Sequence, residues 1–199
     1  MKKRIGIFLS LLILSLPVWS AHGREIQIRL APQFGVLGRE NQQVLNRALK
    51  KFILLMPEAN VSVQITSKWF ISSSLIYARI RDKQFFDAFG VRQNGHADVY
   101  GATLGVKIVS STEDPSEGDF FDDTRWWFSL ETGPYVTDVQ SPIIGNNSEM
   151  SFGLNAGAGF DYFFHRIFGV GLQTKFHYVT YSPDDYFLFS FGPHLTAKF

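Results

Sequence analysis

Apolar and polar residues alternate through the last fourteen positions of this chain, up to a final aromatic residue, Phe199. Apolar side chains occupy every second position from Phe187 onward, and most residues between them are small or polar. Successive side chains of a β-strand point to opposite faces, so this segment predicts a strand with one apolar and one polar face. The same alternation recurs along the chain, which predicts an all-β protein.

Eight segments of this kind are separated by turn or loop residues. They span residues 25–36, 52–65, 69–80, 99–109, 125–137, 151–162, 168–178 and 186–199. Residues 42–56 also fit an amphipathic helix, so 42–52 stay open between a loop helix and a strand. In the third segment both faces carry apolar residues, and Arg79 favours the odd-numbered positions for the polar, inward face.

The first twenty residues have the form of a secretory signal peptide. Three basic residues at positions 2–4 precede an apolar run that ends near Trp19, and small residues follow at Ser20 and Ala21. We predict cleavage after Ser20, with the bond after Ala21 as the alternative, and a barrel domain spanning 21–199. A retained membrane anchor fits less well, because the run is short and contains Pro17.

Composition excludes several classes of function. Cysteine is absent, which excludes disulfides and thiolate metal sites. Loss of residues 1–20 removes three cations from the 19 basic residues and leaves the 18 acidic ones, so nucleic acid is not an expected partner. We expect no cofactor, no catalytic residues and no metal site. Residues 110–124 are acidic, and solvated charge explains them better than a calcium site, because the spacing of known calcium loops is missing.

The strands are long enough to cross a bilayer core, which takes about 9–11 tilted residues. Strand edges cannot be left unpaired in hydrocarbon, so strands with a lipid-facing wall must close into a cylinder. The sequence therefore predicts an eight-stranded antiparallel up-and-down transmembrane β-barrel. Prolines at positions 32, 57, 134 and 193 fall on the outward face, and we expect bulges or strand ends there.

The inward face supplies a predicted polar network in the lumen. Its members are Gln27, Arg29, Lys107, Glu131, Asn155, Asp161, Gln173, Lys175, His177 and His194. Eight strands leave a lumen that side chains can fill, so we expect a polar plug in which the charges pair, with Arg29, Lys107 and Glu131 at similar heights. The alternative is that water fills the gaps and solvates these charges.

Threading the strands from a periplasmic N-terminus predicts the two rims. The predicted aromatic girdle on the periplasmic side comprises Trp69, Trp126, Tyr162, Phe164 and Phe168, joined by Ile65, Trp127, Phe163 and Phe199. A sparser belt at the other rim comprises Tyr135, Tyr178, Tyr181, Tyr186 and Phe187. The predicted outer loops are residues 38–51, 81–98, 138–149 and 182–185.

The chain resembles the small outer-membrane barrels of the OmpA-like and OmpX-like porin family. The resemblance rests on the signal peptide, on "MSFGLNAGAGFDYFF" followed by "FGVGLQTKFHYV", and on the closing "FLFSFGPHLTAKF". It implies a place in the outer membrane of a Gram-negative bacterium, contact with outer-membrane lipid and lipopolysaccharide, and insertion by the outer-membrane assembly machinery. In that family the terminal aromatic residue, here Phe199, is read as the assembly signal.

The sequence leaves four hypotheses about what the protein is and does. We expect a structural or interaction role, in membrane integrity, adhesion or surface recognition, with an extracellular partner bound through the loops. A narrow pore for small solutes is the second hypothesis. A lipid A-modifying enzyme is the third, and its only candidate residues are His177, Ser182 and Asp184 or Asp185. A soluble β-sandwich, with one sheet face buried, is the fourth.

Overall fold

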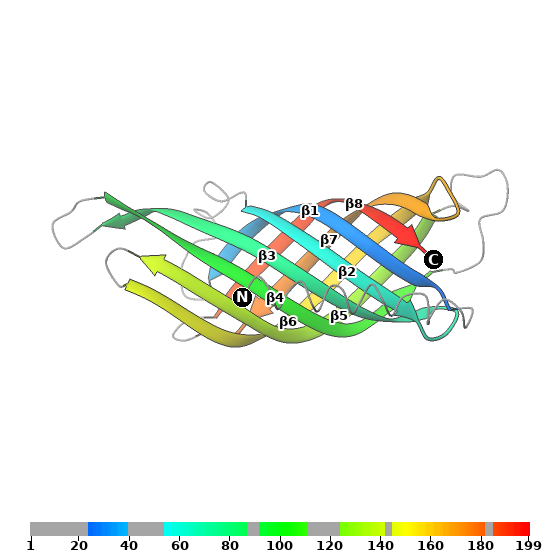
Figure 1. Cartoon of the computed structure of the whole chain (residues 1–199), viewed down its shortest axis with the longest axis horizontal. Helices are drawn as coiled ribbons and strands as arrows, with labels where there is room; N and C mark the ends of the chain where they lie inside the picture. Colours follow the sequence, from blue (N-terminus) through cyan, green and yellow to red (C-terminus); the bar gives the residue numbers. More distant parts are fainter. Residues whose placement is uncertain (1–23, 40–53, 87–91, 111–123, 142–144, 182–184) are drawn as a thin grey trace.

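Eight antiparallel strands form a closed barrel in chain order (Figure 1). The computed structural model describes residues 24–39, 54–86, 92–110, 124–141, 145–181 and 185–199. The strands are β1 (Ile26–Arg39), β2 (Leu54–Gln64), β3 (Trp69–Phe86), β4 (Arg92–Val109), β5 (Thr124–Ser141), β6 (Gly145–Phe163), β7 (Phe168–Val179) and β8 (Tyr186–Lys198). β1 pairs with β8, which closes the cylinder, so the predicted fold class is confirmed and the sandwich hypothesis is wrong.

Side chains alternate between the wall and the lumen along every strand. In β6 and β7, Leu154 and Leu172 are about half exposed, whereas their neighbours Asn155 and Gln173 are buried. The apolar face therefore points outward and the polar face inward, as the alternation predicted. Ile26 is an exception, because it is buried at the start of β1. Among the described residues, no helix is long and apolar enough to cross a membrane.

The predicted orientation of the third strand is wrong. Phe70, Ser72 and Ser74 of β3 are buried in the lumen, and the odd-numbered Ile71 and Leu75 face outward. Arg79 also lies on the outer surface, where it forms an ion pair with Asp98 of β4. A charged partner on the neighbouring strand is what allows this arginine to occupy the outward face.

Two predicted outer loops, 81–98 and 138–149, are largely strand. β3 continues to Phe86 and β4 resumes at Arg92, with one irregularity in the register between Asp82 and Phe85. β5 and β6 likewise continue to Ser141 and from Gly145. These four strands extend beyond the other four at the left of Figure 1. We call residues 77–86, 92–99, 136–141 and 145–151 the extended sheet, and the opposite end, with the β2–β3 and β6–β7 turns, the turn end.

The prolines interrupt hydrogen bonding without shifting the register. Pro57 lies just beyond Glu58↔Ile76, the last pair of the β2–β3 ladder. Pro134 lies in a gap of the β4–β5 ladder, and the pairs on either side of that gap keep one register. Pro57 is the residue at which the β2–β3 ladder ends, although β2 itself begins at Leu54, and the described pairs show no bulge at any of the four prolines. The reason is that each proline removes one N–H donor and adds no residue.

Three predictions fall wholly or partly on residues outside the described ranges. The signal peptide, residues 1–20, is one of them. The alternative helix at 42–56 is the second, although its last three residues, 54–56, belong to β2 and are therefore strand. Most of the acidic 110–124 segment also lies outside the described residues.

Candidate functional site: the barrel lumen

The middle of the lumen is built around two buried carboxylates and one lysine. Lys175 of β7 donates a hydrogen bond to Glu58 of β2, and its ammonium lies 3.9 Å from Glu131 of β5. All three side chains are at most 2% exposed. Ser74 accepts a further bond from Lys175 at 3.1 Å. A buried ion pair of this kind is tolerable only when the remaining polar atoms are also satisfied, which is what the surrounding residues do.

Neutral donors from four other strands bind Glu131. Ser72 donates to its Oε1 at 2.7 Å and Thr103 donates to its Oε2 at 2.6 Å. Asn60 and Asn155 each donate to the same carboxylate at 3.4 Å, and Asn60 also donates to Ser72 at 2.8 Å. Hydrogen bonds to an ionised carboxylate are stronger than neutral ones, so these small side chains stabilise the charge of Glu131.

A second cluster surrounds Asp161 of β6, nearer the turn end. Its Oδ2 accepts a hydrogen bond from Arg29 at 2.8 Å, and its Oδ1 accepts bonds from His194 and Thr196, both at 2.6 Å. The guanidinium of Arg29 also stacks 4.2 Å from the ring centre of Trp127. One carboxylate therefore connects β1, β6 and β8 across the lumen.

Lys107 is held differently, by an amide and two aromatic rings. It donates to Gln27, and its ammonium lies 5.1 Å from the ring centre of Phe70 and 6.0 Å from that of Trp127. Gln27 in turn donates to Glu25, which forms an ion pair with Arg125 at 3.0 Å. The turn end of the lumen thus combines a chain of polar contacts with cation–π contacts.

Buried apolar side chains form one cluster toward each end of this polar network. Phe70, Val109 and Trp127 form a buried cluster toward the turn end. A larger buried cluster lies toward the extended sheet and comprises Met56, Ile76, Ala78, Val99, Tyr135, Val179, Tyr186 and Leu188. Tyr135 bonds to His177 at 3.1 Å, which joins this second cluster to the polar network. Buried apolar clusters therefore lie on both sides of the polar network.

The structure places all ten predicted lumen residues inside the barrel, each at most 4% exposed. Their role as a plug stays a prediction. The expected common height of Arg29, Lys107 and Glu131 stays a prediction. Their partners differ, because Arg29 binds Asp161, Lys107 binds Gln27 and Glu131 lies with Lys175. Sequence reasoning missed further members, which are Gln33, Glu58, Asn60, Ser72, Ser74, Thr103, Arg125, Ser190 and Thr196. All occupy inward alternate positions, and Ser72 and Ser74 were missed because β3 was assigned the wrong face.

The predicted girdle residues gather at the turn end. Trp69, Trp126, Phe164 and Phe168 are 45–60% exposed, and Tyr162 is partly buried. Two other residues expected there, Trp127 and Phe163, instead point inward and are buried. The Phe199 side chain is exposed. Its backbone N–H donates to the Ile26 carbonyl, and its carbonyl accepts from the Ile26 N–H, both at 2.9 Å. Whether Phe199 acts as the assembly signal stays a prediction.

Only two of the four candidate catalytic residues, His177 and Asp185, lie in the described part of the chain. His177 is fully buried in the lumen, and Asp185 accepts hydrogen bonds from Tyr178 and from the Tyr181 N–H. The bond from the Tyr178 hydroxyl, followed by that N–H, lowers the pKa of Asp185. Ser182 and Asp184 lie outside the described residues. Within the described ranges, no three His, Asp or Glu side chains are grouped to hold a metal ion.

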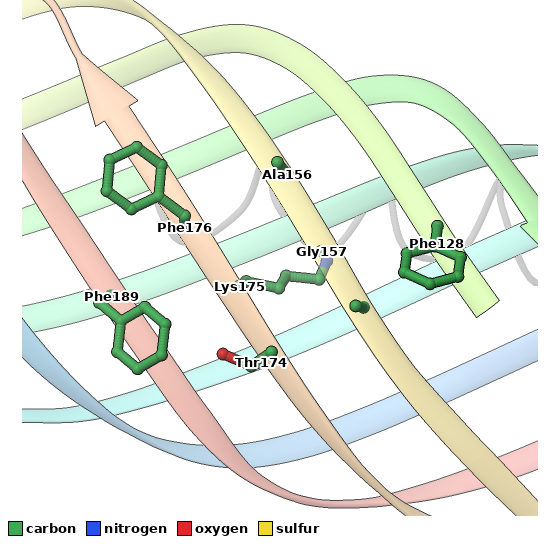
Figure 2. A pocket seen from close by; sticks show the side chains of 8 residues that line it. Phe128, Ala156, Gly157, Thr174, Lys175, Phe176 and Phe189 are labelled. Carbon is green, nitrogen blue, oxygen red and sulfur yellow. The ribbon is translucent and has the colours of Figure 1, made fainter. Parts of the chain in front are cut away.

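A shallow apolar depression of about 260 Å³ lies on the outer wall over β5 to β8. Figure 2 shows Phe128 on one side of it and Phe176 and Phe189 on the other. Its floor consists of small residues, including Ala156 and Thr174. The Thr174 hydroxyl donates to the Ser190 carbonyl at 3.1 Å, and most of the surface of the depression is apolar.

Comparison with known proteins shows the fold. No protein-family model matches the chain, and no curated protein matches it. Among solved structures, Neisserial surface protein A (NspA) is similar with a TM-score of 0.60 and 10% identity, over 89% of this chain and 97% of that one. Ail, the attachment invasion locus protein of Yersinia pestis, is similar with a TM-score of 0.53 and 14% identity, over 88% of this chain and 99% of that one, in a complex with the heparin analogue sucrose octasulfate. At these identities, the shared property is the eight-stranded barrel.

Proposed function

We propose that this protein is an outer-membrane barrel of a Gram-negative bacterium with a structural and interaction role at the cell surface. The observation that carries the proposal is the outer wall, where apolar side chains such as Leu104, Phe128 and Leu195 are 59–65% exposed. A wall of this composition is stable when lipid covers it, whereas in water so large an apolar surface promotes aggregation. Outer-membrane lipid and lipopolysaccharide are accordingly its proposed partners.

The interaction role rests on the extended sheet. Its outer strands, β3 and β6, run beyond their pairing with β2 and β7, which ends at Glu58↔Ile76 and Gly153↔Val179. In the described part of the chain, both therefore carry unpaired backbone groups along one edge. Such edges pair readily with an extended segment of another protein. We propose this sheet, outside the membrane, as the contact surface for an extracellular partner.

Location and orientation are tested by single cysteines, because the chain has none of its own. Asn147→Cys lies on the exposed extended sheet, and Ser67→Cys lies in the β2–β3 turn. On intact cells, a membrane-impermeant maleimide should label Cys at position 147 but reach position 67 only after the outer membrane is permeabilised. Recovery of the protein in the aqueous fraction without detergent, or the reverse labelling, contradicts the proposal.

A trimmed variant tests the interaction role. Replacing residues 80–97 by a two-residue turn removes much of the extended sheet and leaves the paired wall of β3 and β4 intact. We expect this variant to keep the faster gel migration of an unboiled folded barrel and to lose the adhesion of expressing cells to a host-cell layer. Adhesion equal to that of the wild type excludes the sheet as the contact surface.

A further inference from the structure

The β1–β8 seam joins the first and last strands of the barrel. It has no connecting turn, so noncovalent contacts alone hold it closed. The ladder between the two strands is regular near the turn end, from Gln27↔Lys198 to Leu30↔Leu195. It is regular again farther along, from Phe34↔Phe191 to Arg39↔Tyr186. Residues 31–33 and 192–194 lie between these stretches without ladder pairs. The register is the same on both sides, which places Pro32 opposite Pro193.

Both prolines occupy a position where a strand pair normally exchanges two hydrogen bonds. Ile26 and Phe199 exchange two such bonds, each 2.9 Å long. In an antiparallel ladder every second pair does so, and Pro32 opposite Pro193 belongs to this series. Neither proline has an N–H, so both bonds are missing and two carbonyl oxygens of the wall lose their donors.

The other prolines have a smaller effect. Pro57 and Pro134 each face a residue that keeps its N–H, Tyr77 and Ala102 by register, so each removes a single donor. Among the described strand pairs, only β1–β8 loses both donors at one place. The seam without a turn is therefore also the seam with the largest local gap in its backbone hydrogen bonding.

Side chains hold this seam where the backbone does not. Inside the barrel, the Ser190 hydroxyl donates to Gln33, whose own amide donates to Glu58. On the outer wall, the rings of Phe34 and Phe191 lie 6.3 Å apart across the seam. The strands also approach closely, because a Cβ at Gly192 would lie 2.8 Å from the Pro32 carbonyl oxygen.

We propose that the barrel opens laterally at the β1–β8 seam, starting at Pro32 and Pro193, and that the Gln33–Ser190 and Phe34–Phe191 contacts act as a clasp that keeps it closed. This inference rests on the barrel and its register, and does not depend on the proposed surface role. Opening exposes the inner network at Gln33 to the membrane side of the wall.

Amide hydrogen exchange, measured by NMR on the purified protein in detergent micelles, tests the proposal. The seam-facing amides of Leu30, Phe34, Phe191 and Leu195 should exchange about tenfold faster or more than those of Ala156, Ala158, Leu172 and Phe176, which face the regular β6–β7 seam. In a Pro32→Ala/Pro193→Ala variant, which regains both donors, this difference should fall to less than threefold, and the new amides at 32 and 193 should be protected.

Two further variants keep the test decisive. Pro134→Ala restores one donor in the β4–β5 seam and should leave exchange at the β1–β8 amides unchanged. Pro193→Ala alone restores one donor and serves if the double variant does not fold. Equal protection of the two wild-type seams overturns the proposal. An unchanged β1–β8 exchange rate in the Pro32→Ala/Pro193→Ala variant and in the Pro193→Ala variant overturns it as well.

Discussion

At the scale of single residues, the lumen depends on charges that are paired while fully buried. Asp161 satisfies Arg29, His194 and Thr196 together, and both members of the ion pair are 2% exposed. Asp161→Asn removes the negative charge and leaves the Arg29 guanidinium without compensation. We expect a loss of about 3–5 kcal/mol in the free energy of unfolding, because an uncompensated buried charge is costly. Urea unfolding in micelles, followed by tryptophan fluorescence, measures it.

The matched control is the ion pair on the outer surface. Arg79 binds Asp98 through two hydrogen bonds, and the arginine side chain is 44% exposed. Arg79→Gln should cost no more than about 1 kcal/mol, because solvent screens the half-exposed guanidinium and Asp98 keeps the hydrogen bond from the Tyr77 hydroxyl at 3.0 Å. If Asp161→Asn costs no more than Arg79→Gln, the buried pair does not stabilise the barrel as described.

At the scale of strands, glycines on the inward face make room for large side chains. The ring of Tyr135 on β5 lies between Gly101 on β4 and Gly153 on β6, and a Cβ at either glycine would approach it to 2.6 or 2.5 Å. The Tyr135 ring cannot move away from one glycine without approaching the other. Gly101→Ala should therefore lower the free energy of unfolding by about 1–3 kcal/mol, the range for overpacking a filled interior.

Gly35→Ala provides the comparison, because its neighbour is flexible. A Cβ at position 35 meets the sulfur of Met56, and an unbranched thioether side chain can move away. We expect Gly35→Ala to destabilise less than Gly101→Ala in the same urea assay. The reverse order would show that Tyr135 is not confined by the two flanking strands.

The strands differ in how well the sequence predicts them, and the reason is the contrast between their faces. In β6, β7 and β8 nearly every outward residue of the barrel wall is apolar and most inward residues are small or polar, so their orientation was predicted correctly. In β3 three serines, Ser72 to Ser74, fall on both faces and remove that contrast. The extended sheet was predicted as loops because, beyond the apolar wall, no alternation marks a strand.

The lumen was predictable as a set of residues but not as a set of pairs. Alternation identifies inward positions within one strand, so Arg29, Asp161 and Glu131 were found. Which carboxylate meets which cation depends on the stagger between strands around the whole cylinder, which no local pattern contains. This is why the pair of Arg29 and Asp161 was not predicted, and why Glu58, the carboxylate that binds Lys175, was not selected.

At the scale of the whole molecule, the wall and the lumen have opposite polarity, and the lumen ends in apolar clusters. Phe70, Val109 and Trp127 lie toward one end, and the cluster around Tyr135 lies toward the other. A barrel filled in this way should pass few ions, which separates the structural role from the alternative of a narrow pore. In planar lipid bilayers, we expect the wild-type protein to show no stable single-channel current.

Removing both closures should open a path through the same barrel. Trp127→Ala with Tyr135→Ala deletes one buried ring near each end of the lumen. Water can then reach the buried charges between them, such as Lys175 and Glu131. We expect this variant to show discrete channel openings, while Trp126→Ala, the neighbouring tryptophan on the outer wall, stays as silent as the wild type. Gel migration before and after boiling confirms that each variant is a folded barrel. Wild-type currents equal to those of the double variant would instead favour the pore, because the two aromatic closures would then impose no barrier to ions.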